Sequence, residues 1–136
     1  MFDITKPETV RVALLAGGTS GEREISLASG AGAKKALEEA GFLVTQLDPA
    51  QRDDLAALVD GGFDVAFLCT HGRGGEDGAL QGFLETIGLP YTGSDVRASA
   101  MAMHKGVAKQ AYAAAGIRTP DSLTLREGEP YDLDAI

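Results

Sequence analysis

The chain has 136 residues, enough for one domain with its own core, and its hydrophobic content of 44% is ordinary. Its 20 acidic and 12 basic residues give a net charge of −8, which argues against nucleic acid or an anionic membrane as the main partner. The single cysteine, Cys69, excludes an internal disulfide and a cysteine metal cluster. No apolar run reaches the roughly 18 residues of a membrane span, and the N-terminus lacks a signal-peptide pattern. We therefore expect a reduced, cytoplasmic protein.

Short apolar strands alternate with helices along the first ninety residues. The predicted strands cover residues 10–16, 42–48 and 63–70. The predicted helices cover residues 22–41, 51–62 and 76–88, and glycine ends each of them. This alternation indicates βαβ units, so we predict an α/β fold with an open, mostly parallel, Rossmann-like sheet and helices on both faces.

Two of the predicted helices have a recognisable face. Small and apolar residues of the first helix fall near one side, which predicts close packing on the sheet: Ile25, Ala28, Gly32, Ala36 and Leu37. The third helix has a stripe of large apolar residues that we expect to be buried: Leu80, Phe83, Leu84 and Ile87.

The remaining third of the chain is less regular. Residues 89–93 predict a brief strand or a turn, and residues 94–116 predict one helix, or two that meet near residues 104–106. Residues 117–125 predict an extended segment. Because no closing helix follows, we interpret the end of the sequence as a linker.

Two glycine-rich loops follow the first and third predicted strands. They read AGGTSGERE, residues 16–24, and THGRGGEDG, residues 70–78. In an open parallel sheet, ligands bind beyond the carboxyl ends of the strands. Since the first and third strands are neighbours in many such sheets, we expect the two loops to face one another across a crevice.

The first loop offers one candidate binding residue, Glu22. The loop glycines fit neither the G-x-G-x-x-G pattern nor a Walker A loop, which argues against a dinucleotide-dependent oxidoreductase. Glu22 stands where the helix begins, so its carboxylate either caps the helix or points into the crevice. In the second case it would bind a cationic group such as an ammonium.

The second loop contributes His71 and Glu76. Its glycines permit positive φ angles and let the backbone approach a ligand closely. His71 either organises the loop by hydrogen bonding or contacts a ligand, and one histidine with one acid is too few for a metal site. Cys69 is expected to be a small core residue rather than a nucleophile. Lys105 and Lys109, four apart on one helix face, are either solvated or contact phosphates.

Together these segments resemble the N-terminal part of the D-alanine–D-alanine ligases, which are ATP-grasp enzymes. The resemblance rests on LLAGGTSGEREISLASG and on HGRGGEDGALQGFLETIGLPYTGSDVRASAMAMHK, and it covers residues 10–125. It implies a pre-ATP-grasp sheet and an ATP-dependent ligation. ATP phosphorylates one D-alanine carboxylate, and the amino group of a second D-alanine attacks the acyl phosphate. The dipeptide feeds peptidoglycan synthesis.

The resemblance also implies a role for each candidate residue. Glu22 matches the glutamate that binds the ammonium of the first D-alanine, and Ile25 matches the apolar position beside it. His71 matches a histidine near the same substrate, and Glu76 matches an acid that orders the site. Lys105 matches a lysine that reaches the ATP phosphates.

One position departs from the family pattern. His104 stands where the family usually has aspartate, between Met103 and Lys105. We interpret the family aspartate as a residue that shapes the local helix. With histidine in its place, the orientation of Lys105 is expected to be affected.

The resemblance implies a division of the chain into two parts. Residues 1–100 would form the N-terminal substrate-binding domain, and residues 101–136 the linker helix and the start of the central ATP-grasp domain. Family ligases are much longer, so most of the ATP pocket, the ligands of Mg²⁺ (or Mn²⁺) and the second D-alanine site would lie outside this chain. The isolated chain is therefore expected to be inactive, and a homodimer is expected.

Two other functions remain open on the sequence. The chain could be a stand-alone small-molecule binding or interaction module of the same fold. It could also belong to an ATP-grasp ligase for another amino or hydroxy acid, because selectivity for the second substrate would be set elsewhere.

Overall fold

The computed structural model describes residues 3–125, 127–128, 130 and 132. A short 3-10 helix, η1 (Pro7–Thr9), precedes the first strand. The elements then follow in the order β1 (Arg11–Leu15), α1 (Arg23–Glu39), β2 (Leu43–Leu47), α2 (Arg52–Asp60), β3 (Val65–Leu68), α3 (Ala79–Thr86), α4 (Val96–Met103) and α5 (Lys105–Ala114). The predicted strands and helices are confirmed, each one to a few residues shorter than the apolar pattern suggested.

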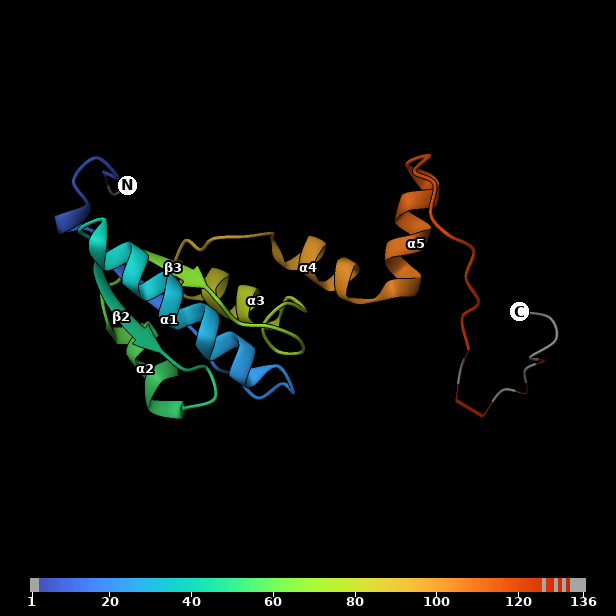
Figure 1. The fold of residues 1–136 in the computed structure, drawn as a ribbon, viewed down its shortest axis with the longest axis horizontal. Helices are drawn as coiled ribbons and strands as arrows, with labels where there is room; N and C mark the ends of the chain where they lie inside the picture. The colour runs from blue at the N-terminus through green and yellow to red at the C-terminus, as the bar shows by residue number, and fades with distance from the viewer. Residues whose placement is uncertain (1–2, 126, 129, 131, 133–136) are drawn as a thin grey trace.

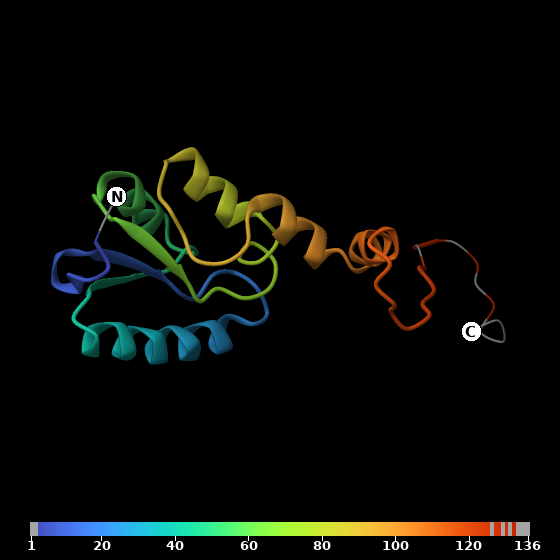
Figure 2. The ribbon, with the colours of Figure 1, turned by 90° about the horizontal axis from the view of Figure 1, so that it is seen from above.

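The three strands form one parallel sheet in the order β2-β1-β3. Helix α1 covers one face of the sheet, and α2 and α3 cover the other (Figures 1 and 2). The predicted fold class is therefore confirmed. Because β1 and β3 are neighbours, the loops that follow them leave the same edge of the sheet side by side.

The core has two layers, one on each face of the sheet. Successive side chains of β1 point alternately into one layer and the other. Ala13 and Leu15 pack with apolar residues of α2 and α3, while Leu14 and Ala16 pack toward α1 with Cys69. Ala13, Leu14 and Leu15 of β1 and the following Ala16 are all fully buried, since successive side chains of a strand point to opposite faces and both faces are covered.

The predicted stripe of α3 is confirmed. Leu80 and Leu84 are buried in the core, and Phe83 and Ile87 pack against it while partly buried. After α3 the chain returns along β3: residues 89–93 form an isolated parallel bridge between Ala66 and Tyr91 rather than a full strand.

The predicted inner face of α1 is wrong except at Leu37. Ile25 is 59% exposed, and Ala28, Gly32 and Ala36 are also exposed. The face against the sheet instead consists of Ser26, Gly30, Ala33 and Leu37. Those residues also recur at helical spacing, so the helix is rotated by about one residue, roughly 100°, from the predicted orientation.

Helices α4 and α5 meet at His104, as the alternative with two helices predicted. Asp95 caps α4 by accepting a hydrogen bond from Ala98 N, and His104 caps α5 by accepting one from Val107 N through Nδ1, at 3.3 Å. Helix α5 projects away from the sheet in both views (Figures 1 and 2). Residues 117–125 form neither helix nor strand, and no helix among the described residues is long and apolar enough to cross a bilayer.

Candidate functional site

The loops after β1 and β3 are joined directly by hydrogen bonds. Ser20 Oγ donates to the carbonyl of His71 at 2.7 Å, and the same hydroxyl accepts from Glu22 N at 3.1 Å. One serine side chain of the first loop therefore touches both loops. This contact brings the two loops together at one edge of the sheet, as the order of the strands predicted.

A second, fully buried serine joins the loops beneath the crevice. Ser26 Oγ accepts from Gly17 N and donates to the carbonyl of Cys69, both at 2.8 Å. Ser26 is 0% exposed and lies on α1, so this hydroxyl links the helix to the ends of both strands. Polar groups buried without such partners cost folding free energy, which makes the bridge important for the geometry above it.

Asp48 directly follows β2, on the opposite side of β1 from the second loop, and its carboxylate binds the first loop. Its carboxylate accepts hydrogen bonds from Gly18 N at 2.8 Å and Ala50 N at 2.9 Å, and it lies 2.6 Å from an Arg23 guanidinium nitrogen. Partial burial opposes ionisation of Asp48, but the bonds from Arg23, Gly18 and Ala50 outweigh it and lower the pKa of the carboxyl. Asp48 therefore stays ionised to a lower pH than an ordinary aspartate.

Glu22 stands at the N-cap of α1, yet its side chain makes no capping hydrogen bond. Within the described residues, its carboxylate also has no ion pair or other hydrogen bond. The carboxylate lies against the second loop, so close that a Cβ added to Gly72 would come within 2.9 Å of Glu22 Oε1. Of the two roles considered for Glu22, the geometry therefore favours an acceptor that points into the crevice.

His71 and Glu76 are held together in the second loop, and His71 lines the smaller cleft. His71 Nε2 is 3.3 Å from Ser29 Oγ of α1, and His71 Nδ1 is 3.7 Å from Glu76 Oε1. The other carboxylate oxygen of Glu76 accepts from Gly72 N at 2.7 Å, which closes the loop on itself. His71 organises the loop through these contacts while its ring stays at the crevice.

Two clefts open between the loops. One of about 190 Å³ lies over the strand ends and includes Gly18, Thr70 and His71. A wider one of about 700 Å³ is lined by Glu22 and Asp77 among others, and Arg73 borders both clefts. To a ligand that enters, the crevice thus presents the Glu22 carboxylate, which has no partner in the described part of the chain, and the nearby guanidinium of Arg73.

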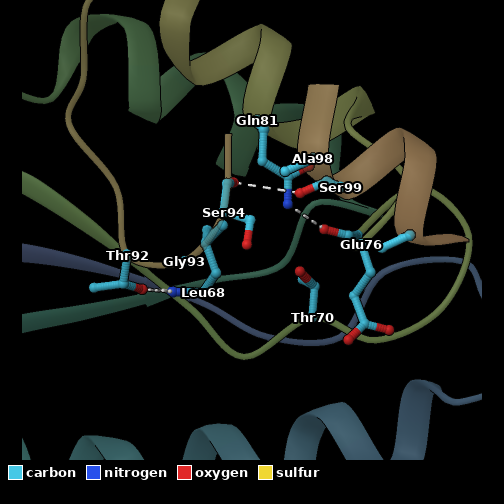
Figure 3. Close-up of a pocket in the computed structure, with 11 residues that line it drawn as sticks. Leu68, Thr70, Glu76, Gln81, Thr92, Gly93, Ser94, Ala98 and Ser99 are labelled. Atoms are coloured by element: carbon cyan, nitrogen blue, oxygen red, sulfur yellow. Dashed lines mark hydrogen bonds between the residues drawn. The ribbon is translucent and has the colours of Figure 1, made fainter. Parts of the chain in front are cut away.

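A third cavity, of about 330 Å³, lies behind the second loop and beneath the start of α4. Figure 3 shows Thr70 and Gln81 facing one another across it, with the Glu76 carboxylate turned to the opposite side of the loop. Gln81 Nε2 donates to the carbonyl of Gly75 at 2.9 Å, but Gln81 Oε1 and Thr70 Oγ1 are buried without a hydrogen-bond partner. Thr70 and Gly75 border both this cavity and the smaller cleft, whereas Glu22 lines only the wider one.

The other two predicted site residues lie apart from this cluster. Ile25 is on the exposed side of α1, where it is available to a ligand but does not pack in the core. Lys105 is the exposed first residue of α5, a helix that lies away from the sheet (Figure 1). Lys109, on the same helix, donates to Thr119 Oγ1 at 3.3 Å and to the carbonyl of Pro120, so it is not a free cation.

Cys69 packs in the core on the α1 side of the sheet, and burial raises the pKa of its thiol. Both observations fit the predicted core residue and not a nucleophile, because the thiolate is the reactive form. Among the described residues, no group of three or more His, Cys, Asp or Glu side chains could hold a metal ion.

Sequence reasoning missed several residues that build the site: Ser20, Arg23, Ser26, Asp48 and Asp77. Asp48 had a usable signal, because it follows β2 at the same edge of the sheet as the two loops. Asp77 accepts from Gly74 N and Ala79 N, and the bond from Gly74 is the main cause of its lowered pKa. Short polar side chains beside loop glycines typically make such local bonds.

Comparisons with known proteins agree with this geometry. A family profile described as the D-ala D-ala ligase N-terminus matches residues 44–94. A D-alanine–D-alanine ligase of Geobacter sulfurreducens is 49% identical over 125 residues, which is 92% of this chain and 39% of that protein. One of Aromatoleum aromaticum is 54% identical over 110 residues, covering 81% of this chain and 35% of the relative.

The fold comparison gives the same result. A crystal structure of the Bacillus anthracis D-alanine–D-alanine ligase complexed with ATP superposes with a TM-score of 0.81 at 32% identity, over 93% of this chain and 43% of that one. The Aeromonas hydrophila ligase gives a TM-score of 0.77 over 93% of this chain and 54% of that chain. This chain therefore spans less than half the length of the curated relatives, and it matches the N-terminal part of the D-alanine–D-alanine ligases in both sequence and fold.

Proposed function

We propose that this chain is the N-terminal, substrate-binding part of an ATP-dependent D-alanine–D-alanine ligase that supplies a dipeptide for peptidoglycan synthesis. The observation that supports it best is the Glu22 carboxylate, which lies against the second loop, lines an open cleft and has no protein partner among the described residues. A carboxylate in this setting suits a small ammonium, because charge-assisted hydrogen bonds are about twice as strong as neutral ones.

In this proposal Glu22 binds the ammonium of the first D-alanine and fixes its orientation. His71 and Glu76 line the other side of the substrate, and Ile25 packs against its methyl group. Holding one reactant in this way lowers the entropy cost of the reaction, since the carboxylate then meets its phosphoryl donor in a fixed geometry. The wrapped glycine loop also restricts water around a carboxyl group that becomes an acyl phosphate.

The ATP and metal requirements come from the family, whose reaction consumes ATP with Mg²⁺ or Mn²⁺. We propose that Lys105 reaches the ATP phosphates from the start of a central domain, and that the metal ligands lie outside this chain. The division at residue 100, a homodimer and a cytoplasmic location belong to the same proposal. The position of Lys105 on a separate helix supports the division, because the lysine then moves with the second domain.

The test is made on the full-length protein that contains this chain. We expect D-alanyl-D-alanine formation with release of ADP, and a fall in kcat/KM of about 100-fold for Glu22→Gln, as for loss of an ion-paired contact worth about 3 kcal/mol. Glu24→Gln is the matched control, because Glu24 is an exposed acid of the same helical turn.

Two outcomes would contradict the proposal. Absence of ligase activity in the wild-type protein with D-alanine and MgATP would favour a binding module. Unchanged D-alanine affinity and turnover in Glu22→Gln would show that the ammonium binds elsewhere. The 136-residue chain alone is expected to be inactive in the same assay.

A further inference from the structure

Both ends of the loop that contains Glu22, residues 18–23, bind the carboxylate of Asp48. Gly18 begins the segment 18–23 and donates its N–H to Asp48 Oδ1 at 2.8 Å. Arg23 ends it, with a guanidinium nitrogen 2.6 Å from Asp48 Oδ2. Glu22 therefore lies inside a short loop whose first and last residues share the same anchor.

Arg23 closes this loop a second time. Its Nη1 donates to the carbonyl of Gly18 at 2.8 Å, so the Gly18 residue is held through its N–H by Asp48 and through its carbonyl by Arg23. The planar guanidinium donates in two directions at once, which an ammonium on a lysine does less well. These contacts close residues 18–23 into a ring. Glu22 lies within this ring, at the N-cap of α1.

Asp48 is itself held in place by the start of α2 and by the turn that precedes this helix. Its N–H donates to Asp54 Oδ2 at 2.7 Å, and its Oδ1 also accepts from Ala50 N. The first loop rests directly on it: a Cβ added to Gly17 would lie 2.6 Å from Asp48 Cγ, and Gly17 has a φ of +105°. Only glycine allows this approach and this conformation together, so loop and carboxylate are packed as one unit.

We propose that Arg23 and Asp48 are positioning residues: their ion pair holds the loop 18–23 on the end of β2 and thereby sets the place of the Glu22 carboxylate in the cleft. Neither side chain lines the clefts between the loops, so both act through the loop and not on the ligand. This inference rests on the proposed function for its kinetic consequence, but not for its structural one.

The experiment compares Arg23→Met, Arg23→Lys and Asp48→Asn in the full-length protein. The matched control is Lys34→Met, which removes the 3.8 Å pair with Glu38 on the same helix, away from the loop. We expect KM for the first D-alanine to rise about tenfold in Arg23→Met and Asp48→Asn, as for loss of one charge-assisted bond. KM for ATP should stay unchanged, and Arg23→Lys, which keeps the charge but not the fork, should fall between.

A second readout does not depend on ligase activity. Hydrogen exchange of the Gly18 amide, measured in the same proteins, should accelerate about tenfold in Arg23→Met and stay at the wild-type rate in Lys34→Met. Urea unfolding of each variant identifies any that fails to fold, and Arg23→Lys and Asp48→Asn remain informative if Arg23→Met does.

The outcomes separate the two proposals. If the wild-type protein lacks ligase activity but Gly18 exchange accelerates, the proposed function fails and the fastening of the loop stands. If Gly18 exchange accelerates while the D-alanine KM stays within twofold of wild type, the ion pair holds the loop without positioning Glu22, and the inference is overturned. Unchanged exchange in all folded variants overturns it as well.

Discussion

Replacement of Gly30 by alanine tests how closely α1 lies on the sheet. Gly30 is buried, and a Cβ added to it would lie 2.4 Å from Ala16 Cβ and 3.6 Å from Leu14 Cδ2. Carbon atoms in contact are normally about 3.5–4.0 Å apart, so α1 and β1 must separate by about 1 Å or more to accept the methyl group. Neither atom belongs to a long, flexible side chain that could turn away.

The loss of unfolding free energy can be estimated from three contributions: overpacking, helix propensity and the hydrogen bonds of Ser26, which lies on the same face of α1. Overpacking of a core costs about 1–3 kcal/mol, and alanine returns about 0.5–1 kcal/mol of helix propensity over glycine. The two 2.8 Å bonds of Ser26, one turn away, would lengthen as the helix lifts, at about 1 kcal/mol each. We expect Gly30→Ala to lower the free energy of unfolding by about 2–4 kcal/mol.

Gly32 provides the control on the same helix. It is exposed, and a Cβ there would meet nothing within 4 Å, so Gly32→Ala should raise the free energy of unfolding by about 0.5–1 kcal/mol. Equilibrium urea unfolding, followed by circular dichroism, measures both variants. If Gly30→Ala proves as stable as Gly32→Ala, α1 does not pack closely on β1. Close packing then does not fix the position of the first turns of α1.

Three further predictions concern buried or ionised polar groups. Ser26→Ala should lower the free energy of unfolding in urea by about 2–4 kcal/mol, because two buried backbone groups lose their partner. Ser29→Ala, at an exposed position, should lower it by less than about 1 kcal/mol. Equal losses in the two variants would refute the buried hydrogen bonds of Ser26. Thr70→Val should raise the thermal stability slightly, since it removes a buried hydroxyl without a partner, and a clear loss would show that a bound molecule completes this group. The lowered pKa of Asp48 predicts stability that is complete above its ordinary value of 3.8 and lost as pH falls through the lower folded value. A pH series of unfolding midpoints should therefore be shallower between about pH 5 and pH 2 in Asp48→Asn, and an identical slope would contradict the assignment.

The candidate site was predictable from sequence to the extent that it depends on strand ends. Loops that follow neighbouring parallel strands must meet, so Glu22 and His71 were expected across one crevice, and Ser20 joins them there. The same rule applied to β2 would have found Asp48. The sequence alone does not single out this residue, because a lone aspartate after a strand has no local pattern that distinguishes it from an ordinary turn residue.

The orientation of α1 shows where periodicity stops being informative. The set that includes Ile25 and the set that includes Ser26 both recur at helical spacing, and both contain small residues. Hydrophobicity favoured the first, but the sheet accepts the second, because Ser26 satisfies a donor and an acceptor at the strand ends and Gly30 allows close contact with Ala16. A buried serine with two partners is invisible to a pattern that counts only apolar residues.

Local sequence therefore determined the alternation of strands and helices, the fold class, the stripe of α3 and the two motifs that identify the family. These depend on interactions between residues that are near one another in the chain, or on strand ends that any parallel sheet brings together. Tertiary structure alone decided the face of α1, the anchoring of the first loop and the partners of Ser26. Those depend on hydrogen bonds between residues such as Gly18 and Asp48, or Ser26 and Cys69, which meet only when the sheet has formed.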